Sequence, residues 1–395
     1  MRNMMNCWWL LSVSSLLLGA SAIHADAAQG KPLLLEDDLV YRTTEQTPYN
    51  HASNIVQLPN GDFLVCWGTG EGEFMRNLQA VISWRTAASR EWTAPEVIGK
   101  TGEENAGNPV LFVDPKGRTW LFFNRRPEQS DQYWRPQRPF PHQKAYIVCR
   151  VSEDNGRTWG SEQIVAREPG SQLRCPPIVL TNGDWLLPIH DERDMTTLML
   201  ISSDQGKTWT PSQKMIIPRG GALTPDNPYY REGCIEPAVL QRGDGTVVCY
   251  MRYMWNERKY PPLIWRSVSA DNGRTWTAPE QTDFFNSNSG IAFLRLKSGN
   301  WLLAFNDSPS GRRPLMVALS TDEGRSWAAE APIKYGMGTY SYPSLTQTRD
   351  GLIHMTYSFS RYDPQTKGDK PAGIRHAVFS EAFIRERGWP LAPTD

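Results

Sequence analysis

Pairs of short hydrophobic runs recur along the whole chain, and each pair is joined by a polar turn that contains glycine. The runs alternate apolar with polar residues or are apolar throughout, as half-buried and fully buried strands do. Asn-Gly, Lys-Gly, Asp-Gly and Ser-Gly turns between strand-forming runs predict β-hairpins. The turn glycines are Gly61, Gly117, Gly183, Gly245, Gly299 and Gly351. Six hairpins are therefore expected, at residues 55–67, 110–123, 178–190, 238–252, 291–306 and 344–358.

An eight-residue phrase, S-x-D-x-G-x-T-W, alternates with these hairpins. It begins at Ser152, Ser202, Ser269 and Ser320, with Ser326 in the threonine place of the last copy. Asp, Ser and Thr side chains bond to nearby backbone groups, Gly supplies a positive φ, and Trp packs back on the sheet. The phrase therefore predicts a tight structural turn without a chemical role.

Hairpin and turn phrase together predict a repeated unit of four antiparallel strands. The phrase starts lie 50, 67 and 51 residues apart, which is a period typical of repeat architectures. Six such units predict an all-β fold, a six-bladed β-propeller of four-stranded antiparallel blades. In the first and last units we expect decayed phrases at residues 83–92 and 380–389, because each keeps a Ser and a Trp nine apart.

The hairpin arrangement predicts which residues share a face. The first strand of each hairpin begins, and the second ends, at the same end of the blade, so all twelve of these strand ends gather around one mouth of the central channel. The opposite, glycine-turn end carries ordinary loop residues such as Asn60 and Lys116. The predicted substrate-binding residues at the mouth are His51, Arg76, Arg174, His190, Arg252, Asn288, Asn306, Arg313 and Tyr357.

The turn phrase resembles the Asp-box, or bacterial neuraminidase repeat, of the sialidase-like β-propellers. In that family three arginines bind a sugar carboxylate, a Tyr paired with a Glu is the nucleophile, and an Asp is the acid/base. The resemblance assigns the Glu to Glu236, which opens the fourth hairpin, and one clamp arginine to Arg252, which closes it. It places the nucleophile in Tyr340-Ser341-Tyr342-Pro343, where either tyrosine fits.

The chain departs from the family pattern at three places. His51-Ala52-Ser53-Asn54 stands where the family has the Arg-Ile-Pro phrase of its first clamp arginine, as in a divergent bacterial branch. Residues 286–289, Asn-Ser-Asn-Ser, stand where the third arginine opens blade five. His and Asn cannot copy the bidentate geometry of a guanidinium. The acid/base Asp is missing as well, and Glu73 and Asp191 are the candidate proton donors.

Three functions remain open. The first is an exo-acting, sialidase-like glycoside hydrolase that removes a terminal acidic or modified sugar from a glycan. The second is a polysaccharide lyase acting on uronate, in which His51 or His190 with Tyr342 and Arg252 would remove a proton and hold the carboxylate. The third is a carbohydrate-binding propeller without catalysis.

Charge and residue content indicate which classes of partner and cofactor to expect. Lys plus Arg and Asp plus Glu number 42 each, and no basic tail occurs, so a nucleic-acid partner is not expected. Cys and His spacings resemble no zinc site, and neither a metal nor another cofactor is expected. The expected partner is a carbohydrate, and the oligomeric state stays open.

The N-terminus has the pattern of a processing signal. Arg2 precedes the apolar run of residues 7–18, which is too short for a stable membrane anchor, and an A-x-A site ends at Ala27. Residues 1–27 are therefore a predicted signal peptide and residues 28–395 the propeller domain, exported to a periplasm or secreted. Five cysteines remain after cleavage, so at least one thiol is free, and Cys175 with Cys234 is the candidate disulfide.

Overall fold

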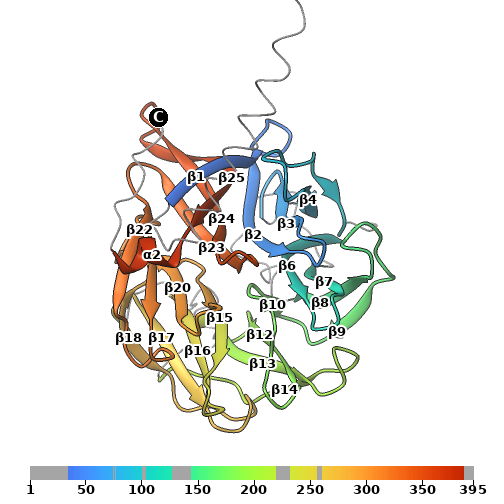
Figure 1. Cartoon of the computed structure of the whole chain (residues 1–395), viewed down its shortest axis with the longest axis vertical. Coiled ribbons are helices and arrows are strands. Elements are labelled where there is room, and N and C mark those ends of the chain that lie inside the picture. The colour runs from blue at the N-terminus through green and yellow to red at the C-terminus, as the bar shows by residue number, and fades with distance from the viewer. Residues whose placement is uncertain are drawn as a thin grey trace, which may run out of the picture.

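Six four-stranded antiparallel sheets surround a central channel in the computed structural model (Figure 1). The structure describes residues 34–73, 75, 77–99, 104–126, 144–218, 232–255 and 260–386. Within them no helix is long and apolar enough to cross a membrane. The prediction of an all-β, six-bladed propeller is confirmed.

The strands of the first three blades follow chain order from the channel outward. Blade one contains β2 (Tyr49–Gln57), β3 (Phe63–Gly70), β4 (Gln79–Arg85) and β5 (Glu96–Val97). Blade two contains β6 (Asn105–Val113), β7 (Thr119–Arg126), β8 (Tyr146–Ser152) and β9 (Gln163–Ala166). Blade three splits its inner strand into β10 (Ser171–Leu173) and β11 (Ile178–Val179), followed by β12 (Trp185–Asp191), β13 (Thr196–Ser202) and β14 (Thr210–Pro211).

The next two blades repeat this order, and the last one differs from it. Blade four contains β15 (Gly233–Gln241), β16 (Val247–Met254), β17 (Leu263–Ser269) and β18 (Glu280–Phe285). Blade five contains β19 (Ala292–Arg295), β20 (Trp301–Asn306), β21 (Leu315–Ser320) and β22 (Ala329–Lys334). Blade six contains β23 (Thr339–Gln347), β24 (Ile353–Asp363), β25 (Gly368–Phe379) and, as its outermost strand, β1 (Leu34–Arg42).

The expected turn at residues 380–389 is wrong for the part that the structure describes. Ser380 caps the short helix α2 (Glu381–Arg385), and its hydroxyl accepts the Phe383 N–H at 3.2 Å. Because β1 supplies the fourth strand of blade six, this blade needs no turn after β25. Trp389 lies outside the described residues.

The decayed turn of blade one exists, but its retained serine was misassigned. Arg85 pairs with Phe63 as Ser269 pairs with Val247, so Arg85 holds the place of the first serine of the phrase. Ser83 instead matches Ser267, because the hydroxyls of both donate at 2.7 Å to the carbonyl of the Thr that follows the Trp. The turn keeps its length and its Trp92, whereas the other key side chains are replaced.

The four intact phrases share their Ser, Asp, Gly and Thr hydrogen bonds, and blade four shows them. The Ser269 hydroxyl accepts the Gly273 N–H at 2.9 Å and donates to Asp271 at 2.7 Å. Asp271 also accepts from the Thr275 backbone at 2.8 Å and from its hydroxyl at 2.6 Å. The Trp276 indole donates to the Gly273 carbonyl at 3.0 Å, which pins the turn. These bonds fit the structural turn that the sequence predicts for the phrase.

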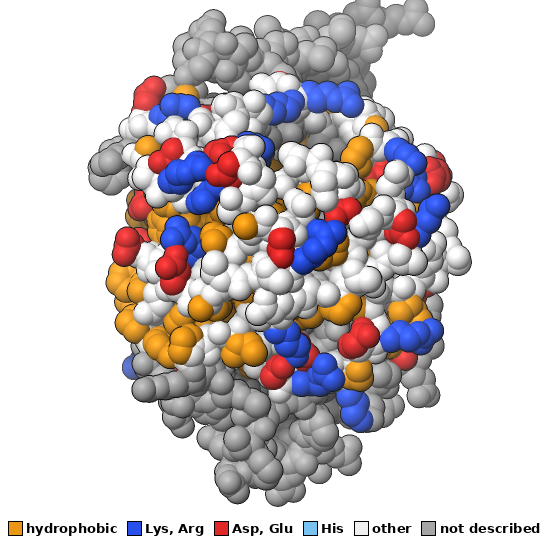
Figure 2. Space-filling view, turned by 90° about the horizontal axis from the view of Figure 1, so that it is seen from below, with side chains coloured by type: hydrophobic (Ala, Val, Ile, Leu, Met, Phe, Trp, Pro, Cys, Tyr) orange, Lys and Arg blue, Asp and Glu red, His pale blue; other side chains and the backbone are white. Residues whose placement is uncertain are grey.

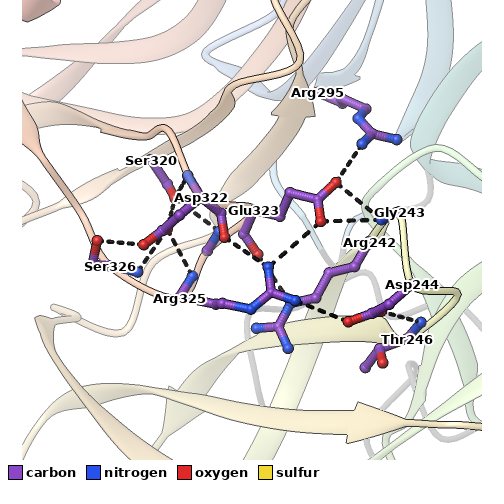
Figure 3. A network of polar contacts seen from close by, with 11 residues as sticks. Arg242, Gly243, Asp244, Thr246, Arg295, Ser320, Asp322, Glu323, Arg325 and Ser326 are labelled. Atoms are coloured by element: carbon purple, nitrogen blue, oxygen red, sulfur yellow. Dashed lines mark hydrogen bonds and ion pairs between the residues drawn. The ribbon is translucent and has the colours of Figure 1, made fainter.

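The turn phrases also connect neighbouring blades. In blade five, Arg325 donates to Asp244 in the hairpin turn of blade four at 2.9 Å, and Glu323 accepts the Gly243 N–H at 2.9 Å (Figure 3). Arg274 reaches Asp184 of blade three in the same way, at 3.0 Å. The repeat thus joins each of these blades to the one before it.

Acid should weaken these turns. Slight burial opposes ionisation of Asp271, but hydrogen bonds from Thr275 and Ser269 outweigh it and lower the pKa of Asp271 to about 2. The unfolded carboxyl titrates near the ordinary value of 3.8, so its contribution to stability is complete above about pH 4 and is lost as pH falls through 2. We expect Asp271→Asn to be less stable than wild type above about pH 4, and this gap to close toward pH 2. Urea unfolding across that range measures it, and a gap independent of pH would contradict the assignment.

Surface charges of both signs are mixed. Lys or Arg and Asp or Glu side chains are intermingled on the side shown in Figure 2, without a continuous area of one sign.

All five described cysteines are buried and free, so the candidate disulfide between Cys175 and Cys234 is not formed.

Candidate functional site

The inner strands of four blades share one irregularity near their beginnings. In blade four the ladder passes from Ile235 to Ala238, so that two residues face one on the partner strand, which is a β-bulge. The first bulged residue has a left-handed backbone, which is an unfavourable state for a bulky side chain. Blades one, two, four and six place Ala52, Asn108, Glu236 and Tyr342 there, with φ of 58°, 48°, 49° and 57°.

Two of these bulges bring a tyrosine and a carboxylate together. The Tyr342 hydroxyl donates to Glu236 Oε1 at 3.0 Å, and both side chains are buried. Burial raises the pKa of Tyr342 to about 12, with Arg252 opposing and Glu236 adding to the rise. The phenol is therefore protonated at neutral pH, and the adjacent carboxylate is a base that can take its proton.

Arg252, at the end of β16, contacts both groups. Its Nη1 lies 2.6 Å from the Tyr342 hydroxyl and 2.8 Å from Glu236 Oε2. Its Nε and Nη2 donate to Asn288 Oδ1 at 2.8 and 2.6 Å. Burial would raise the pKa of Glu236, but the charges of Arg252 and Arg174 outweigh it and lower that pKa. Glu236 is therefore the ionised member of the pair.

Further cations and a histidine surround the Tyr342 ring. The guanidinium carbons of Arg312, Arg174 and Arg252 lie 5.1, 5.2 and 5.9 Å from the ring centroid. The His51 ring lies 4.1 Å from the same ring, centroid to centroid. Burial, followed by the charges of these three arginines, lowers the pKa of His51 well below its usual value. His51 is therefore a neutral imidazole at neutral pH.

Glu73 is the carboxylate on the blade-one side of the site. It lies in the connection from β3 to β4, and its carbonyl oxygen accepts from Arg126 Nη1 at 3.0 Å. Its charge acts on two tyrosines: burial first and Glu73 next raise the pKa of Tyr49 well above its usual value, and Glu73 adds to the rise at Tyr342. Glu73 is thus placed within electrostatic reach of the Tyr342 hydroxyl.

His190 holds the backbone of the Glu236 bulge. Its Nδ1 accepts the Glu236 N–H at 3.3 Å, and its Nε2 lies 3.3 Å from Glu192 Oε1. Because Nδ1 is an acceptor, the proton of the neutral ring is on Nε2, which donates to Glu192. His190 therefore positions the carboxylate of Glu236 through its main chain.

Loss of that acceptor has an expected cost. In His190→Ala the buried Glu236 N–H loses its partner, which lowers the free energy of unfolding by about 1–3 kcal/mol. For the glycosidase proposed below, the shifted carboxylate is expected to lower kcat about tenfold to a hundredfold. Urea unfolding and steady-state kinetics measure the two effects. His190→Asn can still accept this N–H and should lose less of both; equal losses in the two variants would contradict the positioning role.

The comparison with known families agrees with this arrangement. A family model described as a BNR repeat-like domain matches residues 61–355, which is more than half of the chain. The chain belongs to the BNR repeat-like domain family. This BNR repeat protein is also similar to curated sialidases. It is 24% identical to the Micromonospora viridifaciens sialidase over 409 residues, covering 93% of this chain and 57% of that protein.

A second curated relative, the sialidase of Clostridium perfringens, is 28% identical over 159 residues, 39% of this chain and 40% of that protein. The chain spans about half the length of these curated relatives. Among solved structures, the NanB sialidase of Streptococcus pneumoniae has a TM-score of 0.68 at 13% identity, over 89% of this chain and 71% of that one. A Dyadobacter fermentans protein of unknown function has a TM-score of 0.70 at 18% identity, over 88% and 99%. These two structures show the fold alone.

Seven residues predicted from the sequence meet around the Tyr342 hydroxyl and ring of the BNR repeat protein. They come from blades one, three, four and six and from the loop before β19, whose strands are labelled around the channel in Figure 1. They are Tyr342, Glu236, Arg252, Asn288, His51, Arg174 and His190. Glu73 joins them through its charge.

Tyr340 and Tyr357 lie elsewhere. The Tyr340 hydroxyl donates to the Met337 carbonyl at 2.9 Å, and its ring lies 6.3 Å from that of Tyr357 in the core between blades five and six. Regular alternation would place Tyr340 and Tyr342 on the same strand face, but the bulge at Tyr342 breaks the alternation and separates them.

Three other predicted residues have structural partners, and one is not described. The amide of Asn306 donates to the carbonyls of Pro314 at 3.0 Å and Tyr340 at 2.8 Å. Arg313 donates to the Gly338 carbonyl at 2.7 Å. The Asp191 carboxylate lies 2.7 Å from Arg193 and 2.9 Å from Lys214, and despite its burial these bonds lower its pKa, which does not favour a proton donor. Arg76 lies outside the described residues.

Sequence reasoning missed Arg312 and Tyr49. Arg312 stands next to the predicted Arg313, and its Nη2 reaches the Asn288 carbonyl at 3.0 Å. The Arg-Arg pair indicated a cation near blade five but gave no reason to prefer the first of the two. Tyr49 lies two residues before His51, and their rings are 5.7 Å apart.

Proposed function

We propose that this protein is an exo-acting glycoside hydrolase of the sialidase type, which removes a terminal acidic or otherwise modified sugar from a glycan. The observation that carries the proposal is a buried group of three side chains. The Tyr342 hydroxyl donates to Glu236 at 3.0 Å and accepts a hydrogen bond from Arg252 at 2.6 Å. A tyrosine is a weak nucleophile unless a base takes its proton, and Glu236 is that base. Arg252 stabilises the phenolate oxygen as it forms.

The reaction then has two steps. The Tyr342 oxygen bonds to the anomeric carbon while the bond from that carbon to the leaving oxygen breaks; Glu236 receives the phenol proton and Glu73 gives its own proton to the leaving oxygen. Water then attacks the anomeric carbon, Glu73 takes the water proton, and the bond to Tyr342 breaks as Glu236 returns the phenol proton. The balance is one water consumed and one glycosidic bond cleaved, with retention of configuration.

A specific observation supports a lyase as the second candidate. The neutral His51 ring lies 4.1 Å from the Tyr342 ring, and a neutral imidazole can accept a proton. Such an enzyme would remove the proton beside a uronate carboxylate, and β-elimination would leave an unsaturated sugar.

One assay separates the candidates. The mature chain is incubated with a panel of acidic oligosaccharides, and reducing ends and ultraviolet absorbance are followed together. New reducing ends without absorbance support the hydrolase, and absorbance from a conjugated enol acid supports the lyase. Binding without either product indicates a carbohydrate-binding protein and overturns both enzymatic proposals.

We also propose that residues 1–27 direct export and are removed, so that the protein acts in a periplasm or outside the cell. The A-x-A pattern ending at Ala27 supports this proposal. N-terminal sequencing of the protein recovered from its native compartment tests it, with Ala28 as the expected first residue. An intact N-terminus in the cytoplasm would contradict it.

A further inference from the structure

Most hydrogen-bond donors of Arg252 are used by the protein itself. A guanidinium has five N–H groups. Nη1 donates to the Tyr342 hydroxyl, and Nε and Nη2 donate to the same Asn288 oxygen, so three of the five N–H groups have acceptors. Nη1 also forms the ion pair with Glu236. Two parallel N–H groups are what a carboxylate requires for bidentate binding. Arg252 can offer them only after its bonds to Asn288 break.

Asn288 is held in this position from both sides. Its backbone is left-handed, with φ of 58°, and its carbonyl accepts from Arg312 Nη2 at 3.0 Å. The preceding Asn286 braces the loop, because its amide donates to the Ser289 carbonyl at 2.9 Å. The bond between Asn288 and Arg252 is therefore built into the fold of the loop before β19.

Two other arginines beside Tyr342 have donors to spare. Arg312 and Arg174 stand over the Tyr342 ring, at 5.1 and 5.2 Å from its centroid, whereas Arg252 is the arginine that touches the hydroxyl. Among the described residues Arg312 donates only to the Asn288 carbonyl. Arg174 is buried and donates to the Pro343 carbonyl at 2.8 Å, while its Nε has no hydrogen-bond partner among the described residues.

The surroundings of the Tyr342 hydroxyl disfavour a second carboxylate there. Glu236 already lies 3.0 Å from this oxygen, and a substrate carboxylate bound beside it would face the Glu236 charge. His51, packed against the same ring, is neutral and adds no positive charge. A second negative charge there is unfavourable, because Arg252, the cation in contact with this oxygen, is already paired with Glu236.

From these positions we infer that the sugar bound here carries its acid group away from the anomeric carbon, as a uronic acid does. The inference rests on the proposed function, because catalysis through Tyr342 fixes the anomeric carbon at the Tyr342 hydroxyl. In a 2-keto sugar acid such as sialic acid, the carboxylate is attached to that carbon and would meet Arg252 with its donors occupied. In a uronic acid the carboxylate is on C5, across the ring oxygen, where Arg312 and Arg174 can meet it.

Equilibrium binding tests the inference without requiring turnover. Calorimetry of the mature chain measures the Kd of D-glucuronic, D-galacturonic and N-acetylneuraminic acids, with D-glucose as the neutral reference. We expect at least one uronic acid to bind ten times more tightly than N-acetylneuraminic acid and than glucose. Tighter binding of N-acetylneuraminic acid, or no binding of either uronic acid, overturns the inference.

Variants at the loop before β19 sharpen the test. Asn288→Ala releases two donors of Arg252 and should tighten binding of N-acetylneuraminic acid at least tenfold. Asn288→Asp keeps the size of the side chain and its bonds to Arg252, so it should weaken that binding further. Ser287→Ala is the matched control, because the Ser287 hydroxyl has no hydrogen-bond partner among the described residues. It should change neither the Kd of N-acetylneuraminic acid nor the Kd of the uronic acids.

An unchanged Kd for N-acetylneuraminic acid in both Asn288 variants overturns the inference. The proposed function is tested separately. A chain that prefers uronic acids but releases no reducing ends contradicts the hydrolase while keeping the assigned sugar class. A chain that hydrolyses sialosides supports the hydrolase and overturns the sugar class.

Discussion

Tyr342→Phe is expected to lose turnover while keeping its fold. In the proposed reaction no covalent intermediate can form without the phenol oxygen, and loss of a catalytic nucleophile lowers kcat by on the order of 10⁴ or more. The phenylalanine ring still fills the space between His51 and the arginines, and Arg252 remains paired with Glu236 at 2.8 Å. The free energy of unfolding should therefore change by about 1–2 kcal/mol. Steady-state kinetics on the preferred glycan and urea unfolding measure both quantities.

The chain supplies a matched control two residues away on the same strand. Tyr340→Phe removes a part-buried hydroxyl that donates to the Met337 carbonyl at 2.9 Å. It should cost similar stability and leave kcat within about twofold of wild type, since its hydroxyl is not at the site. Full activity in Tyr342→Phe, or a large loss in Tyr340→Phe, would sink the assignment of the nucleophile.

Glu236→Gln should reduce both activity and stability. The amide cannot accept the phenol proton as a base, so kcat falls by about 10²- to 10⁴-fold. The variant also leaves Arg252 buried without its charged partner, and breaking a buried ion pair costs about 3–5 kcal/mol. The first effect is measured by steady-state kinetics and the second by urea unfolding.

The same substitution has a spectroscopic consequence. The charge of Glu236 contributes to the raised pKa of Tyr342, which is about 12, so its neutralisation should lower that pKa. The ultraviolet titration of Glu236→Gln minus that of Glu236→Gln with Tyr342→Phe isolates this one phenol. Glu162→Gln, which breaks the ion pair with Arg125 away from Tyr342, is the control and should retain kcat. An unshifted phenol and an unchanged rate would refute the role of Glu236.

Local patterns were sufficient to predict most of the fold. Each hairpin is predicted by its own glycine turn and the strand-forming residues beside it. Each intact phrase contains its own hydrogen-bond partners, as Ser269, Asp271 and Thr275 show. Only the outermost strand of the last blade and the turn expected at residues 380–389 were predicted wrongly, because the closure of this blade is not local. Nothing within Leu34–Arg42 indicates that this strand pairs with Gly368–Phe379.

The site was predictable at the level of faces, and less so at the level of single side chains. Glu236 and Tyr342 occupy the same bulge in different blades, and a proline follows each of them. A proline cannot donate to the ladder and so marks a break in strand alternation, which was a usable signal for choosing Tyr342 over Tyr340. The choice between Arg312 and Arg313 had no such signal, because it depends on how the loop after β20 returns to Asn288.

The pairing of β1 with β25 affects the order in which the blades fold. Leu34 pairs with Phe379, so the ring cannot close until nearly the whole chain is available, and the entropy of so long a loop must be lost before the closing contacts form. During synthesis β1 emerges first and waits without its partner while the intermediate blades assemble. A chain truncated before Gly368 would keep two unpaired strand edges, one at each side of the gap, and such edges promote association with other chains.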